Sequence, residues 1–490
     1  MICNLKKKNN LKLLQYLMNF LLMVIPFTNM NLMWSFINKN SYLSVYFCVL
    51  NLIFLISLWN IFYNVLQFSK NYMKILNTYF NFMMFMFLLS MITLIVCNSW
   101  LTLFFGWELL GLTSFFLILY YNNWNSMSGS FLTVMSNRLG DMFFILSLYF
   151  FMSFKYSTSM MIMLSMMCFT KSAQFPFSTW LPAAMAAPTP VSSLVHSSTL
   201  VTAGIYLYYR FNLMLFNLNK IFVMLFLITT FIGSLSALIE TDLKKLVAFS
   251  TLSQLGLIFM SFFSSIHGLM FYHLLVHAFF KSILFIISGL MIWSMNSNQN
   301  LNKASIFNVM IFSLMLVSIL NMMSFTMTSG FLSKEILISM SLSSSMMFNI
   351  IMLVILSFTI IYSYRLITSF KMFLNFKMSV NFKMLGIILT YLMFMTLFSY
   401  MWFLNWFFSF NFNVLIKSLM AFMMLSMIFK SLIINVFNNL TMFNFFSSYV
   451  CFVNLEKDVM NSSFFFMYAF QTKMMNWKII SLAVLFMTII

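Results

Sequence analysis

Stretches of about 20 apolar residues with almost no charged side chain follow one another along most of this sequence. An α-helix needs about that length to cross the hydrocarbon core of a bilayer. Only 7% of the 490 residues are charged, whereas a soluble domain carries roughly 25%. The runs are continuous and do not alternate at every second residue, which excludes the strands of an outer-membrane barrel. The sequence therefore predicts an all-α, polytopic membrane protein.

The apolar runs give about fifteen candidate transmembrane helices, which fits 490 residues at about 20 per span. The run at 306–342 is too long for one straight crossing, so we expect it to be broken or tilted. The segment 440–475 mixes charged residues with Phe and Ser, and predicts either a lateral amphipathic helix along the membrane surface or a plain loop. We place the spans at 11–27, 42–63, 74–97, 100–121, 129–152, 159–185, 189–211, 219–239, 245–265, 269–293, 306–342, 346–370, 384–404, 414–437 and 476–490.

The formal net charge of +19 comes mostly from lysines in short loops and at helix ends. Such lysines fix topology, so the charge does not indicate nucleic-acid binding, and their distribution places the N-terminus inside. Phe (66) and Met (51) are very frequent, a usage that favours an AT-rich mitochondrial genome over the alternative of an unusual nuclear or bacterial gene. We therefore expect insertion into a mitochondrial membrane from the matrix side, with no cleavable signal before the first span.

The five cysteines form no CxxC pair and no cluster with the four histidines. This spacing predicts no metal site, haem or iron–sulfur cluster in the chain. The eleven glycines are isolated, so no nucleotide-binding fingerprint is present in the sequence. We expect any redox cofactor to be bound by other chains.

Ionisable side chains inside apolar runs cost roughly 2.5–3.5 kcal/mol each at mid-membrane, so they mark function or pairing. Glu108 has no base in its own span and is either a proton carrier or the partner of a structural lysine elsewhere. Arg138 and Asp141 share a helix face and can form a self-contained ion pair. Lys171 either loses its proton beside a helix break or extends to the membrane surface. His196, among Ser and Thr, is either a relay group or a hydrogen-bonded core histidine.

A second group of titratable side chains recurs at helical spacing. His273, His277 and Lys281 are four residues apart and therefore line one stripe of a helix. The two histidines could hold zinc on spacing alone, but the glutamate of an HExxH motif is missing, so a proton wire is favoured. Lys334 follows Gly330 within the overlong span.

Two of the expected spans carry helix-breaking residues beside a lysine. Pro176 and Pro182 lie close after Lys171, and a proline inside a helix removes a rung of its hydrogen-bond ladder. In the second span the helix-breaking residue is Gly330, which lies just before Lys334. Broken helices at membrane depth survive where they line a buried or watery cavity, as at the ion sites of transporters.

The segments 74–211 and 219–370 each contain about five spans with such a lysine in the middle, so we expect two inverted five-helix repeats. Ordered along the chain, the ionisable groups form a series that suits a proton relay. A charge that arrives near Glu108 would favour the protonated form of Lys171 by attraction, and its departure would favour release of the proton from that lysine. The series is Glu108, Lys171, His196, the stripe of His273, His277 and Lys281, and Lys334.

Six ordered motifs over about residues 75–370 resemble the subunit-5 family of mitochondrial NADH:ubiquinone oxidoreductase (complex I), an antiporter-like family. The block APTPVSSLVHSSTLVTAG is the most specific of them, because related subunits differ there. The motifs are FGWELLGLTSFFLI, SNRLGD, KSAQFPFSTWLPAAMAAPTPVSSLVHSSTLVTAGIYL, ETDLKKLVAFSTLSQLGL, HLLVHAFFKSILF and SGFLSKE.

The resemblance implies a proton-translocating membrane-arm subunit of the mitochondrial inner membrane, with lipids and the adjacent antiporter-like subunit 4 as partners. It implies that NADH, FMN, iron–sulfur clusters and ubiquinone are bound by other subunits. We expect coupling or structural roles for Arg138, Asp141, His273 and Lys244. We expect helix breaks at Pro176, Pro182 and Gly330. The implied proton path consists of Glu108, Lys171, His196, His277, Lys281 and Lys334.

The sequence departs from the family's pattern at its ends. Against that pattern we expect one N-terminal span to be lacking, and YMKILNTYF holds no acidic residue where the family usually has one. The alternative function is a subunit of a cation/proton antiporter; a structural anchor is a third. The expected parts are N-terminal helices (1–73), two repeats (74–211 and 219–370), C-terminal helices (371–437), the lateral helix (440–475) and a final anchoring helix (476–490).

Overall fold

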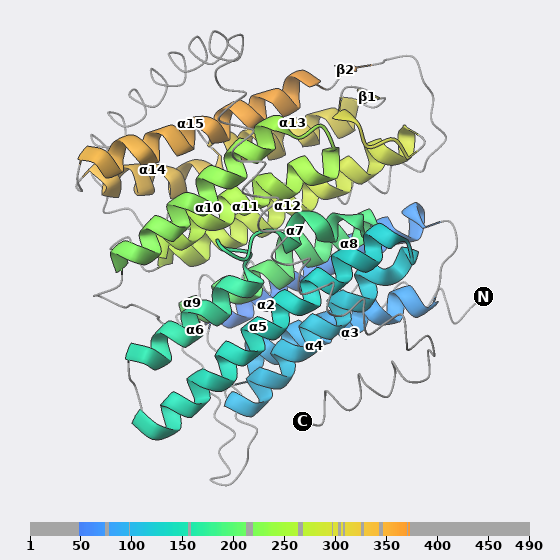
Figure 1. Ribbon diagram of the computed structural model, residues 1–490. Helices are drawn as coiled ribbons and strands as arrows, with labels where there is room; N and C mark the ends of the chain where they lie inside the picture. The colour runs from blue at the N-terminus through green and yellow to red at the C-terminus, as the bar shows by residue number, and fades with distance from the viewer. Residues whose placement is uncertain are drawn as a thin grey trace. The chain divides into compact units, whose positions relative to one another are not determined.

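Nearly all of the chain that the computed structural model describes is helical (Figure 1). The spans expected at 11–27, 384–404, 414–437 and 476–490, and the lateral segment 440–475, lie outside the described residues. The described residues are 49–73, 78–97, 99–154, 158–211, 219–262, 268–295, 297–301, 305–306, 309–324, 328–342, 346–369 and 371–372.

Eight helices of the described ranges are long and apolar enough to cross a membrane, which confirms the all-α, multi-pass fold. A two-residue parallel pair joins β1 to β2, with Ser305 opposite Lys371. The elements are α2 (Val49–Tyr72), α3 (Thr78–Val96), α4 (Trp100–Ile118), η2 (Leu119–Tyr121), α5 (Trp124–Phe154), α6 (Thr158–Lys171), α7 (Trp180–Ala183), η3 (Ala184–Ala186), α8 (Thr189–Val191), η4 (Ser192–Thr199), α9 (Leu200–Arg210), α10 (Asn219–Ile239), α11 (Leu243–Phe262), α12 (Gly268–Ser294), β1 (Ser305–Ile306), α13 (Val309–Met323), α14 (Ser329–Leu342), α15 (Met346–Ser369) and β2 (Lys371–Met372).

The helix α12 forms the centre of the described bundle. Its residues from Leu269 to Ile292 are all buried, and it contacts α2, η4, α11, α13 and α14. A helix that is enclosed on all sides by other helices belongs to the core of the bundle. By contrast, α4 and α5 expose large apolar side chains such as Phe105, Met142 and Met152, as expected for faces turned to lipid or to other subunits.

Both expected helix breaks are present. The span expected at 159–185 ends its first helix at Lys171, and Ala173 has a φ of 54°, which an α-helix cannot accommodate. The span expected at 306–342 divides into α13 and α14, and Ser324 has a φ of 58°. These breaks place the ends of helical segments inside the bundle.

The span expected at 189–211 is also irregular, although in a way that the sequence did not indicate. Its middle, η4, is a π-helix in which the Thr199 hydroxyl donates to the Leu194 carbonyl at 2.7 Å, five residues back. A π-turn inserts one extra residue and rotates the side chains that follow. Because η4 carries His196, this irregular turn determines the position of the imidazole ring.

Two of the chain's three arginines bind the ends of other helices. Arg210 of α9 donates to the carbonyls of Leu94 and Ile95, at 3.3 and 3.4 Å, near the C-terminal end of α3. Arg365 of α15 donates to the carbonyls of Ala237, at 3.2 Å, and Leu238 near the end of α10. The last carbonyls of a helix lack partners within the helix, and leaving them unpaired in lipid is costly.

Candidate functional site

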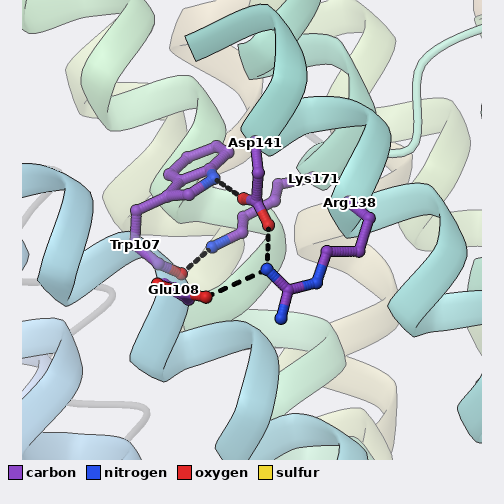
Figure 2. A network of polar contacts seen from close by, with 5 residues as sticks. All are labelled: Trp107, Glu108, Arg138, Asp141 and Lys171. Atoms are coloured by element: carbon purple, nitrogen blue, oxygen red, sulfur yellow. Dashed lines mark hydrogen bonds and ion pairs between the residues drawn. The ribbon is translucent and has the colours of Figure 1, made fainter. Parts of the chain in front are cut away.

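An arginine joins two carboxylates on neighbouring helices (Figure 2). Arg138 Nη1 lies 2.9 Å from Glu108 Oε1 on α4 and 3.4 Å from Asp141 Oδ2 on its own helix, α5. The i,i+3 pair expected from the sequence is present, but it is not self-contained, because Glu108 shares the same arginine. Among the described residues, the ion-pair partner of Glu108 is Arg138, whereas the sequence offered a lysine as the alternative.

Trp107 connects this cluster to Lys171. Its indole Nε1 donates to Asp141 Oδ1 at 3.0 Å, and the Lys171 ammonium lies 3.7 Å from the centroid of its ring. Lys171 also donates to the Trp107 backbone carbonyl (Figure 2). An ammonium over an indole face is attracted by the ring's quadrupole. Trp107 was not among the residues that the sequence singled out, and its place beside the partly buried Glu108 was the one signal available.

The helix break holds Lys171 at the end of α6, completely buried. Trp180 Nε1 donates at 2.9 Å to the carbonyl of Thr170, just before the lysine. Gln174, within the break, accepts a hydrogen bond from Thr229 of α10 at 2.8 Å. The peptide bond before Pro176 is cis. Pro182 lies in the four-residue helix α7, so both prolines predicted to interrupt the span are in its irregular part.

His196 lies beyond Trp180, with ring centroids 6.2 Å apart. The histidine is completely buried, and neither ring nitrogen has a hydrogen-bond partner within the described part of the chain. Lys244, at the start of α11, donates at 3.0 Å to the Ala187 carbonyl between η3 and α8.

The stripe on α12 is buried throughout. Lys281 donates to the Ser250 hydroxyl of α11 at 2.6 Å. His277 has no hydrogen-bond partner for either nitrogen among the described residues, and the same holds for Nδ1 of His273. Within those residues, no three His, Cys, Asp or Glu side chains gather as a metal site would require.

Lys334 of α14 donates a hydrogen bond to the end of α13, the helix that precedes the break. Its ammonium donates to the Met322 carbonyl near the end of α13, and to the Thr359 hydroxyl of α15 at 3.4 Å. A Cβ at Gly330 would collide with the Asn321 carbonyl, so the close approach of α14 to α13 requires glycine there. Lys171 and Lys334 thus share one arrangement, a buried ammonium at a helix break that donates to a backbone carbonyl.

The structure brings the first four predicted groups, Glu108, Arg138, Asp141 and Lys171, into one network. The helix of Lys334, α14, packs against α12, which carries His273 and Lys281. No direct hydrogen bond joins Lys171 to His196, or His196 to His277, in the described ranges, so proton transfer between them would need water. Such an arrangement suits stepwise proton transfer, because amines and imidazoles can each hold and release a proton.

Comparison with known sequences supports this interpretation. The sequence profile described as "NADH:quinone oxidoreductase/Mrp antiporter, TM" matches residues 97–360, more than half of the chain. A protein of Artemia franciscana named NADH-ubiquinone oxidoreductase chain 5 is 40% identical over 282 residues, which are 55% of this chain and 52% of that protein. A protein of Caenorhabditis elegans with the same name is 38% identical over 329 residues, covering 64% and 62%. The chain therefore spans between half and two thirds of the length of these relatives.

Two solved structures share the fold. The Mrp complex from Dietzia sp. DQ12-45-1b aligns with a TM-score of 0.65 at 22% identity, over 78% of this chain and 46% of that chain. The membrane-bound sulfane sulfur reductase, an archaeal respiratory membrane complex, aligns with a TM-score of 0.70 at 16% identity, over 85% and 91%. With the profile match across the ionisable series, the chain belongs to the family of NADH:quinone oxidoreductase and Mrp antiporter membrane subunits.

Proposed function

We propose that this chain is a core membrane-arm subunit of respiratory complex I and moves protons across the mitochondrial inner membrane. The observation that carries the proposal is Lys171, a completely buried amine at a helix break that is linked through Trp107 to a carboxylate–arginine cluster. The names of its relatives support NADH oxidation as the energy source.

In this proposal, Arg138 and Trp107 hold the carboxylates of Glu108 and Asp141 near Lys171, so that a change of charge there alters the proton affinity of the lysine. The proton then passes by His196 and His277 to Lys281 and reaches Lys334. A buried lysine suits this cycle because it can lose its proton, whereas arginine does not.

NADH, FMN, the iron–sulfur clusters and ubiquinone belong to other subunits in this account. The adjacent antiporter-like subunit 4 and lipids are the proposed neighbours. The chain itself supplies proton transfer, as part of an NADH:ubiquinone reductase.

The second candidate is a subunit of a cation/proton antiporter. It is favoured by the likeness in fold to the Mrp complex and by the family's description, which covers both classes. The usage of Phe and Met and the names of the relatives favour the first.

A native gel of detergent-solubilised mitochondrial inner membranes tests the assembly. We expect the chain to migrate with the large band that oxidises NADH. If it migrates as a small particle without that activity, the complex I assignment is wrong and the antiporter becomes the better proposal.

A conservative change at Trp107 tests the link between Asp141 and Lys171. Trp107→Phe keeps an aromatic face under the ammonium but removes the N–H donated to Asp141. A hydrogen bond to a charged group contributes about 1.5–3 kcal/mol, and about 1.4 kcal/mol corresponds to a factor of ten in rate. We expect NADH-driven proton translocation into vesicles to slow about tenfold.

Trp100→Phe is the matched control, because it makes the same substitution on the same helix. Trp100 stacks on Phe211, with centroids 5.1 Å apart, away from the ionisable cluster. We expect it to leave translocation unchanged. Equal rates in the two variants would contradict a role for the Trp107 indole N–H.

A further inference from the structure

Tyr362 of α15 is a buried titratable residue that is not among the residues named in the proposed proton path. Its side chain is completely buried, and its hydroxyl meets two polar groups of α11. Gln254 Nε2 donates to it at 2.9 Å, and the Ser253 hydroxyl lies 3.2 Å away. Both of these α11 side chains are also completely buried. Burying three polar side chains together at membrane depth is costly, so an arrangement of this kind indicates use.

The two lysines on either side of this cluster bond to hydroxyls of the same two helices. Lys281 donates to Ser250 of α11 at 2.6 Å, and Lys334 donates to Thr359 of α15 at 3.4 Å. Ser250 precedes Ser253 by three residues, and Thr359 precedes Tyr362 by three. Residues three apart lie on one helix face, so each lysine contacts the face that carries the cluster.

We propose that Ser250, Ser253, Tyr362 and Thr359 form a hydroxyl relay between Lys281 and Lys334. The inference rests on the proposed function and names a route for one of its steps. Hydroxyls suit the role because each both donates and accepts a hydrogen bond. Gln254 holds the phenol in place and carries no proton itself.

The proton that leaves Lys281 goes to the oxygen of Ser250, and each oxygen in turn releases its own proton to the next group. A water molecule completes the step within each helix, between Ser250 and Ser253 and between Tyr362 and Thr359. The last proton binds the neutral amine of Lys334. Lys281 ends neutral, Lys334 ends charged, and the hydroxyls are chemically unchanged.

Tyr362→Phe tests the relay, because it removes a single oxygen atom. In vesicles that contain the whole complex, we expect NADH-driven acidification of the lumen to slow at least tenfold. Combining it with Ser250→Ala should produce no further slowing, because both changes interrupt one route. A purely structural role for the phenol would instead give additive losses.

Tyr208→Phe is the control. Tyr208 is equally buried, on α9, and its hydroxyl has no hydrogen-bond partner in the part of the chain that the structure describes. We expect wild-type rates from it. If Tyr362→Phe prevents assembly, Ser253→Ala takes its place with the same expectation.

Wild-type rates in Tyr362→Phe, or additive losses in the double variant, would overturn the relay. In either case the wild-type complex still acidifies the vesicles. If the wild-type complex oxidises NADH without acidifying them, the proposed function itself fails. The two failures are therefore distinguishable.

Discussion

Replacing Lys171 with alanine should reduce NADH-driven acidification of vesicles by at least tenfold. The variant removes the amine that links the carboxylate cluster to the rest of the series, and a positioned proton-transfer group typically contributes about 10²–10⁴-fold in rate. Lys171→Arg should not restore the rate, because a guanidinium keeps its proton. The measurement is the initial rate of lumen acidification after addition of NADH and a ubiquinone.

Lys245→Ala is the matched control for this prediction. Lys245 pairs with Asp242 at 3.1 Å, but its side chain is 46% exposed, and exposed pairs of this kind contribute little. We expect near wild-type acidification from it. Full activity in Lys171→Ala, or in Lys171→Arg, would show that no proton leaves this amine during turnover.

Replacing Gly204 with valine should destabilise the helix break that carries Lys171. Even a single Cβ at Gly204 would lie 2.5 Å from the Cys168 carbonyl and 3.3 Å from Ser172, so α9 and α6 could not keep their present approach. Overpacking a close contact costs about 1–3 kcal/mol, and a backbone carbonyl has little freedom to yield. We expect a lower melting temperature of the assembled complex and reduced proton translocation.

Gly268→Val is the matched control, because it makes the same substitution at a helical glycine where packing does not resist a larger side chain. Gly268 is also helical, but an added Cβ there meets no heavy atom of the described residues within 4 Å. Valine has a slightly higher helix propensity than glycine, so we expect this change to alter the free energy of unfolding by less than about 1 kcal/mol and not to lower the melting temperature. Equal melting temperatures for the two variants would contradict the tight α6–α9 contact.

The spans that the sequence located best are those with uniform apolar runs and polar ends. The run expected at 219–239 is α10, and the run at 269–293 is α12 to within one residue at each end. The least accurate was 42–63, because its helix continues to Tyr72. Asn64 and Ser69 look like a loop in the sequence, yet both are buried against other helices. Hydropathy cannot separate such residues from a loop, since burial depends on tertiary contacts.

The candidate site was predictable where it depends on charge. Lys171, Lys281 and Lys334 are conspicuous in apolar runs, and all three are buried in the structure. The contacts that organise them were not predictable from the sequence. Arg138 reaches Glu108 across 30 residues, and Tyr362 reaches Ser253 across 109. Serine, tyrosine and tryptophan are common in membrane helices, so their types alone do not indicate a role.

The inverted repeats stay a prediction, and two correspondences support them. Lys171 and Lys334 each lie at a helix break within their segment. Arg210 and Arg365 each bind the carbonyls near the end of the first helix of their segment. A superposition of residues 74–211 on 219–370 about an axis in the membrane plane should bring these pairs together.

The most direct test of the account is lumen acidification by the wild-type complex in a sodium-free medium. The purified NADH-oxidising particle that contains this chain would be placed in vesicles with a pH-sensitive dye, then given NADH and a ubiquinone. We expect acidification at the same rate with and without sodium, and loss of the pH gradient on addition of a protonophore. Acidification that requires sodium, or NADH oxidation without any acidification, would contradict it.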